Sequence, residues 1–221
     1  MRQKIVLDRS RCDCCGHILP LRDLIPILSW IFLGRACRFC GLRISAFHPF
    51  IEVAATAVVL WAATATSGGV LAASCCFGWL LLTLACIDWR SGLLPDALNG
   101  ILLLAGLVAI ATIDSTAVAG HVIGAAAGFI ALAGLALVYR KVRNREGVGL
   151  GDAKLLAGIG AWVSWQGLPT VILCGSSLAL VYVTAQSLRG KPMKAGDRLA
   201  FGPFLAAAGW LVWLYGPLVP A

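Results

Sequence analysis

Seven long apolar runs constrain this chain more than any other feature. The chain has 221 residues, of which 60% are hydrophobic and only 13% are charged, whereas an ordinary soluble domain has about 25% charged residues. A soluble fold of this length cannot bury that much apolar surface. Because a helix needs about 20 residues to cross a membrane, we predict an all-α membrane protein with about seven transmembrane helices. The runs lie near residues 49–66, 70–87, 97–113, 117–139, 152–165, 168–188 and 199–217.

The basic residues are confined to four segments between these runs. All 18 lysines and arginines lie at 2–43, 90, 140–154 and 189–198. Threading the membrane alternately through the runs places these segments on one face, and the short turns near 66–69, 114–116 and 164–169 on the other. The positive-inside rule makes the basic face, with the amino terminus, cytoplasmic. The net charge of +8 therefore indicates a lipid bilayer as partner, and not nucleic acid.

Small and aromatic residues recur within the runs. Glycine and alanine are dense in the fourth run, around Gly120, Gly124 and Gly128, and such residues let membrane helices pack closely. Tryptophans are typical anchors at the membrane interface, and we expect that role for Trp162, Trp165, Trp210 and Trp213.

Two Cys-x-x-Cys pairs mark residues 1–48 as a cytoplasmic metal-binding module, ahead of a transmembrane bundle at 49–221. A glycine directly follows each pair, where the tight turn needs a permissive backbone. Four thiolates close a tetrahedral zinc shell with no open position, which indicates a structural zinc ion. The alternative is four unrelated reduced thiols, and His17 and Cys14 are expected bystanders. The predicted ligands are Cys12, Cys15, Cys37 and Cys40.

Two acidic residues lie at the predicted membrane surface, where carboxylates are costly and therefore candidate functional residues. Asp88 ends the second run and Asp152 opens the fifth. Both ends face the cytoplasm in the predicted topology, so the two carboxylates can meet. Two carboxylates that share a proton can act as a base on water and as an acid on a carbonyl. We predict a catalytic aspartic dyad.

Helix ends suggest a division of roles within this dyad. Asp152 lies at a helix amino terminus, where the dipole favours a carboxylate, and Asp88 lies at a carboxyl terminus, where it does not. We expect Asp152 to activate the water and Asp88 to carry the proton. Asp152 could instead be a helix N-cap, and Asp96 fits an N-cap better still. Lys154 could hold Asp152 ionised, bind an anionic group, or extend to lipid head groups.

Four segments of the sequence carry recognisable motifs. The first contains the cysteine pairs, Asp23 to Trp30, and His48 to Glu52. The second runs from Ile87-Asp88 to Leu94-Pro95-Asp96. The third, Glu146-Gly-Val-Gly-Leu-Gly-Asp-Ala-Lys154, contains a G-x-G-D element, and the fourth is Phe201-Gly-Pro-Phe204 with the apolar residues that follow. In this order the segments resemble the bifunctional type IV prepilin peptidases, whose G-x-G-D element is shared with other intramembrane aspartic proteases.

The resemblance implies a peptidase of the bacterial inner membrane that removes the basic leader from prepilin or pseudopilin precursors after a glycine. Asp88 and Asp152 carry over as the catalytic pair. The motifs also contain the expected supporting residues Gly149, Gly151, Lys154 and Asp96. No catalytic metal is implied, and the sequence contains no His-Glu-x-x-His motif of zinc metalloproteases.

Longer family members also methylate the new amino terminus with S-adenosylmethionine, an activity associated with the cysteine module. Asp23 and Glu52 are the candidate residues of that region, although Glu52 could equally be an acid in a helix first turn. The family usually begins with a further apolar span, which this sequence does not contain. Either the start is truncated or this member lacks the span, and we expect its absence to affect methylation more than cleavage. Asn99 stands where the family usually has threonine.

Two other functions are compatible with an apolar bundle. A proton-coupled transporter would use acids as a relay, but it predicts them at mid-span. A non-catalytic scaffold of a pilus or secretion assembly would tolerate the loss of both Asp88 and Asp152.

Overall fold

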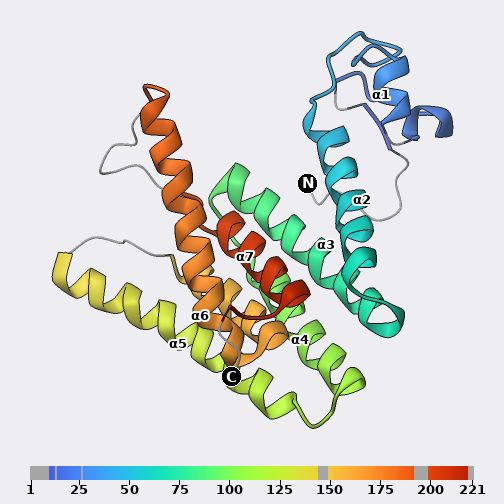
Figure 1. Cartoon of the computed structure of the whole chain (residues 1–221). Helices are drawn as coiled ribbons and strands as arrows, with labels where there is room; N and C mark the ends of the chain where they lie inside the picture. Colours follow the sequence, from blue (N-terminus) through green and yellow to red (C-terminus); the bar gives the residue numbers. More distant parts are fainter. Residues whose placement is uncertain (1–9, 13, 26, 144–148, 192–198, 219–221) are drawn as a thin grey trace. The chain divides into compact units, whose positions relative to one another are not determined.

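The computed structural model describes residues 10–12, 14–25, 27–143, 149–191 and 199–218 (Figure 1). Within these ranges the regular structure is helical, apart from two isolated β-bridges. The elements are a 3-10 helix η1 (Leu21–Leu24) and the helices α1 (Leu28–Phe32), α2 (Phe47–Ala65), α3 (Gly68–Ser91), α4 (Asp96–Ile113), α5 (Val118–Arg143), α6 (Leu150–Leu188) and α7 (Gly202–Tyr215).

The chain divides into two compact units, Met1–Ala57 and Val58–Ala221. This division and the boundary expected from the sequence, after residue 48, both fall within α2. The second unit holds most of the apolar helices, and the first holds the cysteines of the predicted module.

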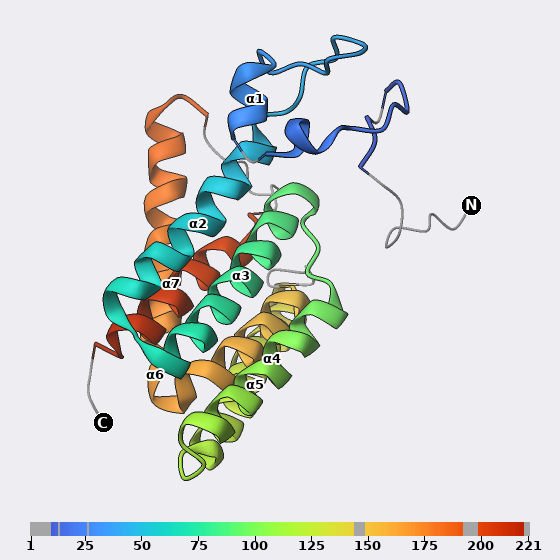
Figure 2. The same ribbon diagram turned by 90° about the vertical axis from the view of Figure 1, so that its right-hand side faces the viewer.

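In the described part of the chain, five helices, α2 to α6, are long and apolar enough to cross a membrane. Helix α6 consists of two helices joined at Ser164, whose φ of 62° is not helical. Figures 1 and 2 show the chain folding back there, within the turn predicted at 164–169. Helix α7 has 14 residues, or about 21 Å at 1.5 Å per residue. Each predicted run thus corresponds to a helix or to one half of α6, and the chain is an all-α, multi-pass membrane protein.

The first half of α6 is the buried centre of the second unit. Its contact with α5 is close because glycines face backbone there. A Cβ atom on Gly124 would lie 2.5 Å from the Gly160 carbonyl oxygen, and one on Gly128 would lie 2.7 Å from the Leu156 carbonyl oxygen. Neither position can carry a side chain unless the helices move apart. The expected role of small residues in helix association is confirmed for this pair of helices.

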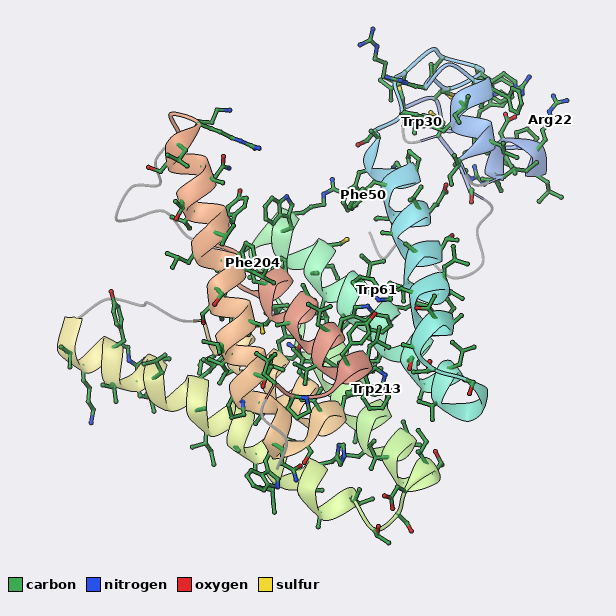
Figure 3. All side chains as sticks on the ribbon, viewed as in Figure 1. Arg22, Trp30, Phe50, Trp61, Phe204 and Trp213 are labelled. Atoms are coloured by element: carbon green, nitrogen blue, oxygen red, sulfur yellow. The ribbon has the colours of Figure 1, made fainter. Side chains whose placement is uncertain are left out.

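Two tryptophans expected at the membrane interface are buried in the bundle. Trp162 is 1% exposed and Trp210 is 7% exposed. The Trp162 ring stacks on Phe77 at 4.6 Å, and its Nε1–H donates to the Leu102 carbonyl oxygen at 2.9 Å. These large rings fill space inside the bundle, so the prediction that both tryptophans lie at the membrane interface is wrong. Trp213, labelled in Figure 3, donates to Ser74 Oγ at 2.8 Å, also inside the unit.

Candidate active site and metal centre

Asp88 lies in the last turn of α3 and is 5% exposed. Its Oδ2 accepts a hydrogen bond of 3.0 Å from the backbone N–H of Gly202, the first residue of α7. A Cβ atom at Gly202 would lie 2.7 Å from the same oxygen, so glycine is needed for this approach. The Asp88 carboxyl group is therefore buried in the bundle.

Asp152 is the third residue of α6, and the N-cap position belongs to Gly149. The Asp152 N–H donates to the Gly149 carbonyl oxygen at 3.1 Å. A Cβ atom on Gly149 would lie 3.6 Å from Asp152 Oδ2, so the carboxylate folds over that glycine. Asp152 is therefore a first-turn acid and not an N-cap.

The two carboxylates converge from different helices. Asp152 lies near enough to Asp88 for their charges to act on each other. The catalytic role of the pair stays a prediction, as does the assignment of the proton to Asp88. That assignment considered only the helices that carry the two residues. The structure adds the amino terminus of α7, whose Gly202 N–H also faces Asp88.

Gly202 and Pro203 begin α7, as its first and second helical residues, where proline costs no hydrogen bond. The group that reaches the site is the Gly202 N–H. A Gly-Pro pair indicates the start of a helix, but the pair does not reveal that the Gly202 N–H donates to Asp88.

Asp96 and Lys154 form an ion pair beside the dyad. Lys154 Nζ lies 2.6 Å from Asp96 Oδ1. Asp96 is the first residue of α4 and the N-cap is Pro95, so the N-cap interpretation of Asp96 is wrong. Lys154 engages Asp96 rather than Asp152. Gly151 lets the first turn of α6 approach this corner, because a Cβ there would lie 3.1 Å from Leu94 Cβ. Glu146 to Val148 of the motif lie outside the described residues.

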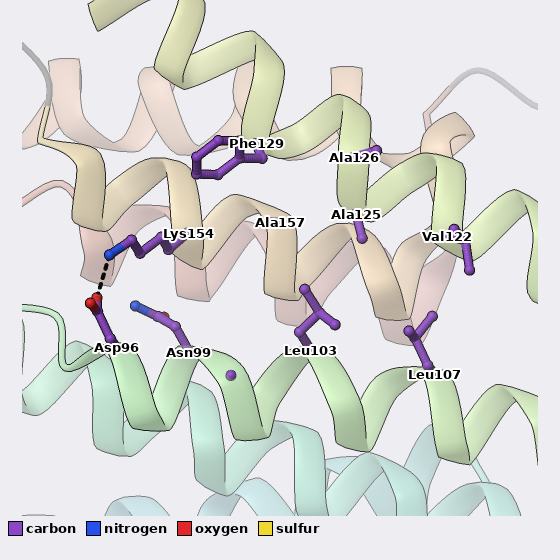
Figure 4. A pocket seen from close by; sticks show the side chains of 11 residues that line it. Asp96, Asn99, Leu103, Leu107, Val122, Ala125, Ala126, Phe129, Lys154 and Ala157 are labelled. Atoms are coloured by element: carbon purple, nitrogen blue, oxygen red, sulfur yellow. Dashed lines mark hydrogen bonds and ion pairs between the residues drawn. The ribbon is translucent and has the colours of Figure 1, made fainter.

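A groove of about 590 Å³ lies between α4 and α5, with α6 as its floor. Figure 4 shows the Asp96–Lys154 pair at one end and Leu103 and Leu107 along one wall. Asn99 also lines the groove, although it is only 3% exposed. Among the described residues, neither Oδ1 nor Nδ2 of Asn99 has a hydrogen-bond partner. The sequence singled out Asn99 as a departure from threonine, but could not show that its amide is unsatisfied.

The two cysteine pairs form matching turns in the first unit. The N–H of Gly16 donates to the Cys12 carbonyl oxygen, and that of Gly41 to the Cys37 carbonyl oxygen, both at 2.9 Å. Both glycines have positive φ, 67° and 69°, as the pattern predicted. A β-bridge flanks each turn, Arg11 to Ile18 and Ala36 to Arg43.

These turns bring four sulfur atoms together. The Sγ atoms of Cys12, Cys15, Cys37 and Cys40 all lie within 4.8 Å of one another, so they can hold one metal ion. Cys12 Sγ and Cys40 Sγ are 3.7 Å apart, close to the ~3.8 Å edge of a tetrahedron with zinc–sulfur bonds of about 2.3 Å. Backbone N–H groups of Cys15 and Cys14 lower the pKa of the Cys12 thiol to about 6. The backbone N–H of Leu42 lowers the pKa of the Cys40 thiol, but burial and the neighbouring thiols outweigh it and raise that pKa to about 12, so a bound metal must displace protons from part of the cluster.

The candidate methyltransferase residues both make contacts within the first unit. Asp23 forms two hydrogen bonds with the Arg38 guanidinium, at 2.7 and 3.0 Å, and these lower the pKa of its carboxyl group. Glu52 Oε2 accepts a hydrogen bond of 2.7 Å from the Ile27 N–H. Ile27 has a φ of 61°, which is unusual for a β-branched residue, and Glu52 helps to hold it. A direct role of either acid in methylation stays a prediction.

Helical membrane spans with two converging carboxylates define a multi-pass membrane protein with a candidate aspartic dyad. The sequence model described as Type IV leader peptidase family matches residues 75–184, and that of the bacterial Peptidase A24 N-terminal domain matches residues 1–66. The chain belongs to the type IV leader peptidase family. No solved structure matches it at a significant level.

Curated relatives cover most of the chain. The prepilin leader peptidase/N-methyltransferase of Aeromonas salmonicida (strain A449) is 37% identical over 216 residues, which are 97% of this chain and 74% of the relative. The protein of that name from Burkholderia pseudomallei (strain K96243) is 38% identical over 219 residues, 97% of this chain and 70% of the relative. The one from Pseudomonas aeruginosa (strain PAO1) is 36% identical over 222 residues, which are 96% of this chain and 73% of the relative.

Proposed function

We propose that this protein is an intramembrane aspartic endopeptidase that removes the basic leader from type IV prepilin or pseudopilin precursors, cutting after a glycine. The observation that carries the proposal is the convergence of Asp88 and Asp152 from α3 and α6. The names of the relatives support the class of substrate. The clustering of basic residues supports a cytoplasmic amino terminus in the bacterial inner membrane.

The chemistry needs one proton shared between the two carboxylates. The ionised carboxylate removes a proton from a water molecule, which attacks the peptide carbonyl carbon, while the protonated one gives its proton to the carbonyl oxygen. Collapse of the resulting diol passes a proton to the leaving amine. We assign the base to Asp152 and the acid to Asp88. Two carboxylates that share one proton titrate as a pair, so the pH profile of cleavage reports on both groups together. Gly202 fixes the orientation of Asp88 through its N–H.

The cysteine cluster fits a structural zinc ion, because its four thiolates leave no coordination position for substrate. We place Cys12, Cys15, Cys37 and Cys40 as the ligands. Methylation of the new amino terminus with S-adenosylmethionine is the second activity that we propose, on the names of the relatives. The hydrogen bonds of Asp23 with Arg38 and of Glu52 with the Ile27 N–H support a role of both acids in holding that region together.

The test is leader removal, scored by mass, with purified protein and a prepilin precursor in detergent. Asp88→Asn and Asp152→Asn should each reduce cleavage at least a thousandfold while the helical content is retained. Asp114→Asn, in the exposed turn after α4, serves as the matched control and should cleave normally. A well-folded wild type without cleavage, or an active dyad variant, would refute the peptidase. Parallel samples with S-adenosylmethionine test independently whether the new amino terminus of the cleaved precursor gains the mass of a methyl group.

A further inference from the structure

The side-chain amide of Asn99 lines the groove between α4 and α5 and makes no hydrogen bond within the described residues. Burying an amide without a hydrogen bond costs about 1–3 kcal/mol on mutational scales, and buried polar side chains in proteins are nearly all paired. Asn99 is 3% exposed, and neither polar atom of its side chain has a partner in the described part of the chain. Figure 4 shows its amide end directed toward the Asp96–Lys154 pair. A group that enters the groove can satisfy it.

The chemistry of the groove favours a peptide over a phospholipid. An amide offers both a donor and an acceptor. The phosphate and ester oxygens of a phospholipid only accept, and its only donors are head-group ammonium or hydroxyl groups, which lose their hydration when they enter an apolar groove. Lys154, the cation at the groove's end, already pairs with Asp96, so this end offers a phosphate little net attraction. A peptide segment presents both N–H and C=O groups.

The junction between a leader and an apolar helix supplies these groups. The first four N–H groups of any helix lack partners within the helix, and the residue just before them still has a free carbonyl oxygen. Asparagine is among the best residues for capping such N–H groups. The groove is lined by Ala125 and Ala126 on α5 and by Ala157 on α6, and small side chains permit close approach of another apolar helix.

We propose that the groove between α4 and α5 binds the start of the precursor's apolar helix and that Asn99 caps its first turn. This rests on the proposed peptidase function and adds to it a positioning residue and a docking path. The groove end at Lys154 lies two residues from Asp152 along α6. A helix start held by Asn99 therefore places the leader junction near the first turn of α6, which carries Gly151 and Asp152.

Photocrosslinking locates the bound precursor. Benzoylphenylalanine replaces Phe129, which lines the groove, or Ile130, the next residue along α5, which is 67% exposed. Both are placed in the Asp88→Asn/Asp152→Asn protein in phosphatidylethanolamine–phosphatidylglycerol vesicles. The probe is a synthetic peptide with a basic leader, a glycine and twenty apolar residues. We expect at least fivefold more peptide adduct from position 129 than from position 130.

The outcomes separate the docking proposal from the peptidase proposal. Equal yields at the two positions, or lipid adducts alone at position 129, overturn the docking even when the wild type cleaves the peptide. Preferential adducts at position 129 without cleavage by the wild type support the docking and refute the peptidase.

Kinetics and stability of Asn99 variants test the amide itself. Asn99→Leu should raise KM about tenfold with kcat within about twofold, because one or two hydrogen bonds to bound peptide are lost. The same change should leave the unfolding temperature equal or higher, since it removes an unsatisfied buried group. Asn99→Thr, which keeps a donor and an acceptor, should retain most of the affinity. An unchanged KM in Asn99→Leu, or a fall in both activity and unfolding temperature, overturns the capping role.

Discussion

The backbone N–H of Gly202 donates a hydrogen bond to Asp88 Oδ2 across 114 positions of the sequence. This bond joins the amino terminus of α7 to the end of α3, so three helices build the candidate site although only two supply carboxylates. An N–H at a helix start is a fixed donor. It orients the Asp88 carboxylate before any substrate arrives.

The Gly202→Ala variant should therefore lose activity without losing its fold. The new Cβ would lie 2.7 Å from Asp88 Oδ2 and 3.1 Å from its Cγ, so the carboxylate or α7 must shift. A displacement of about 1 Å can cost a hundredfold in rate, and we expect a loss of that order in leader cleavage. Gly134→Ala is the control, because a Cβ at Gly134 has no neighbour within 4 Å among the described residues. Equal activity of the two variants would contradict the orienting role.

The sequence predicts the spans and the cysteine turns well because both depend on local pattern. Hydropathy locates the apolar helices, and it places the turn between the two halves of α6 where Ser164 departs from helical geometry. The glycine after each cysteine pair predicts a positive φ, which Gly16 and Gly41 have. These properties need no knowledge of what lies across the bundle.

Contacts between distant segments are harder to predict from an apolar sequence. Lipid and the bundle interior are both apolar, so hydropathy cannot separate buried Trp162 from exposed Trp165. The helix-end argument for the dyad omitted Gly202 for the same reason, because the donor comes from another helix. Asn99 shows the limit most clearly. That its amide has no hydrogen-bond partner among the described residues depends on the shape of the groove, and no sequence motif indicates it.

Acidification should weaken the turn between α4 and α5. Asp114 Oδ1 accepts hydrogen bonds from the Thr116 O–H at 2.6 Å and N–H at 3.0 Å, which lower the pKa of the Asp114 carboxyl group. A lowered pKa contributes stability above the unfolded value of about 3.9, and that contribution disappears as the pH falls through the folded pKa. Thr116→Val should raise the Asp114 pKa, measured by carboxyl carbon NMR.

The matched control for this titration is Thr112→Val. The Thr112 hydroxyl bonds the Ala109 carbonyl oxygen within its own helix and should not affect Asp114. A pKa of Asp114 that is the same in both variants would show that the Thr116 hydroxyl does not stabilise the carboxylate.

Glu52 should act in the first unit as an acceptor for the Ile27 N–H. Glutamine at this position keeps an acceptor oxygen, so Glu52→Gln should retain methyl transfer and resistance of the segment 10–57 to limited proteolysis. Glu52→Ala should lose both, because the Ile27 N–H loses its partner. Loss of methyl transfer in Glu52→Gln with unchanged protease resistance would instead show that methyl transfer requires the negative charge of Glu52.

Metal removal should unfold the cysteine module and spare the transmembrane bundle. Four thiolates hold the two turns together, and structural zinc sites of this kind supply much of the folding free energy of small modules. We expect one zinc per chain by elemental analysis, and its loss in Cys37→Ser, whose side chain is buried in the cluster. Chelation should speed proteolysis of the amino-terminal segment with little change in total helical content, because most helical residues lie in α2 to α7.

Cys14→Ser separates metal binding from thiol content. Cys14 lies between two predicted ligands but is exposed and outside the four-sulfur cluster. The variant should keep full zinc and normal protease resistance, although it also removes one thiol from the same turn. Zinc loss in Cys14→Ser comparable to that in Cys37→Ser would mean that the ligand set differs from the one assigned. Retained zinc in Cys37→Ser would show that three thiolates suffice, and would leave the fourth coordination position open to exchange.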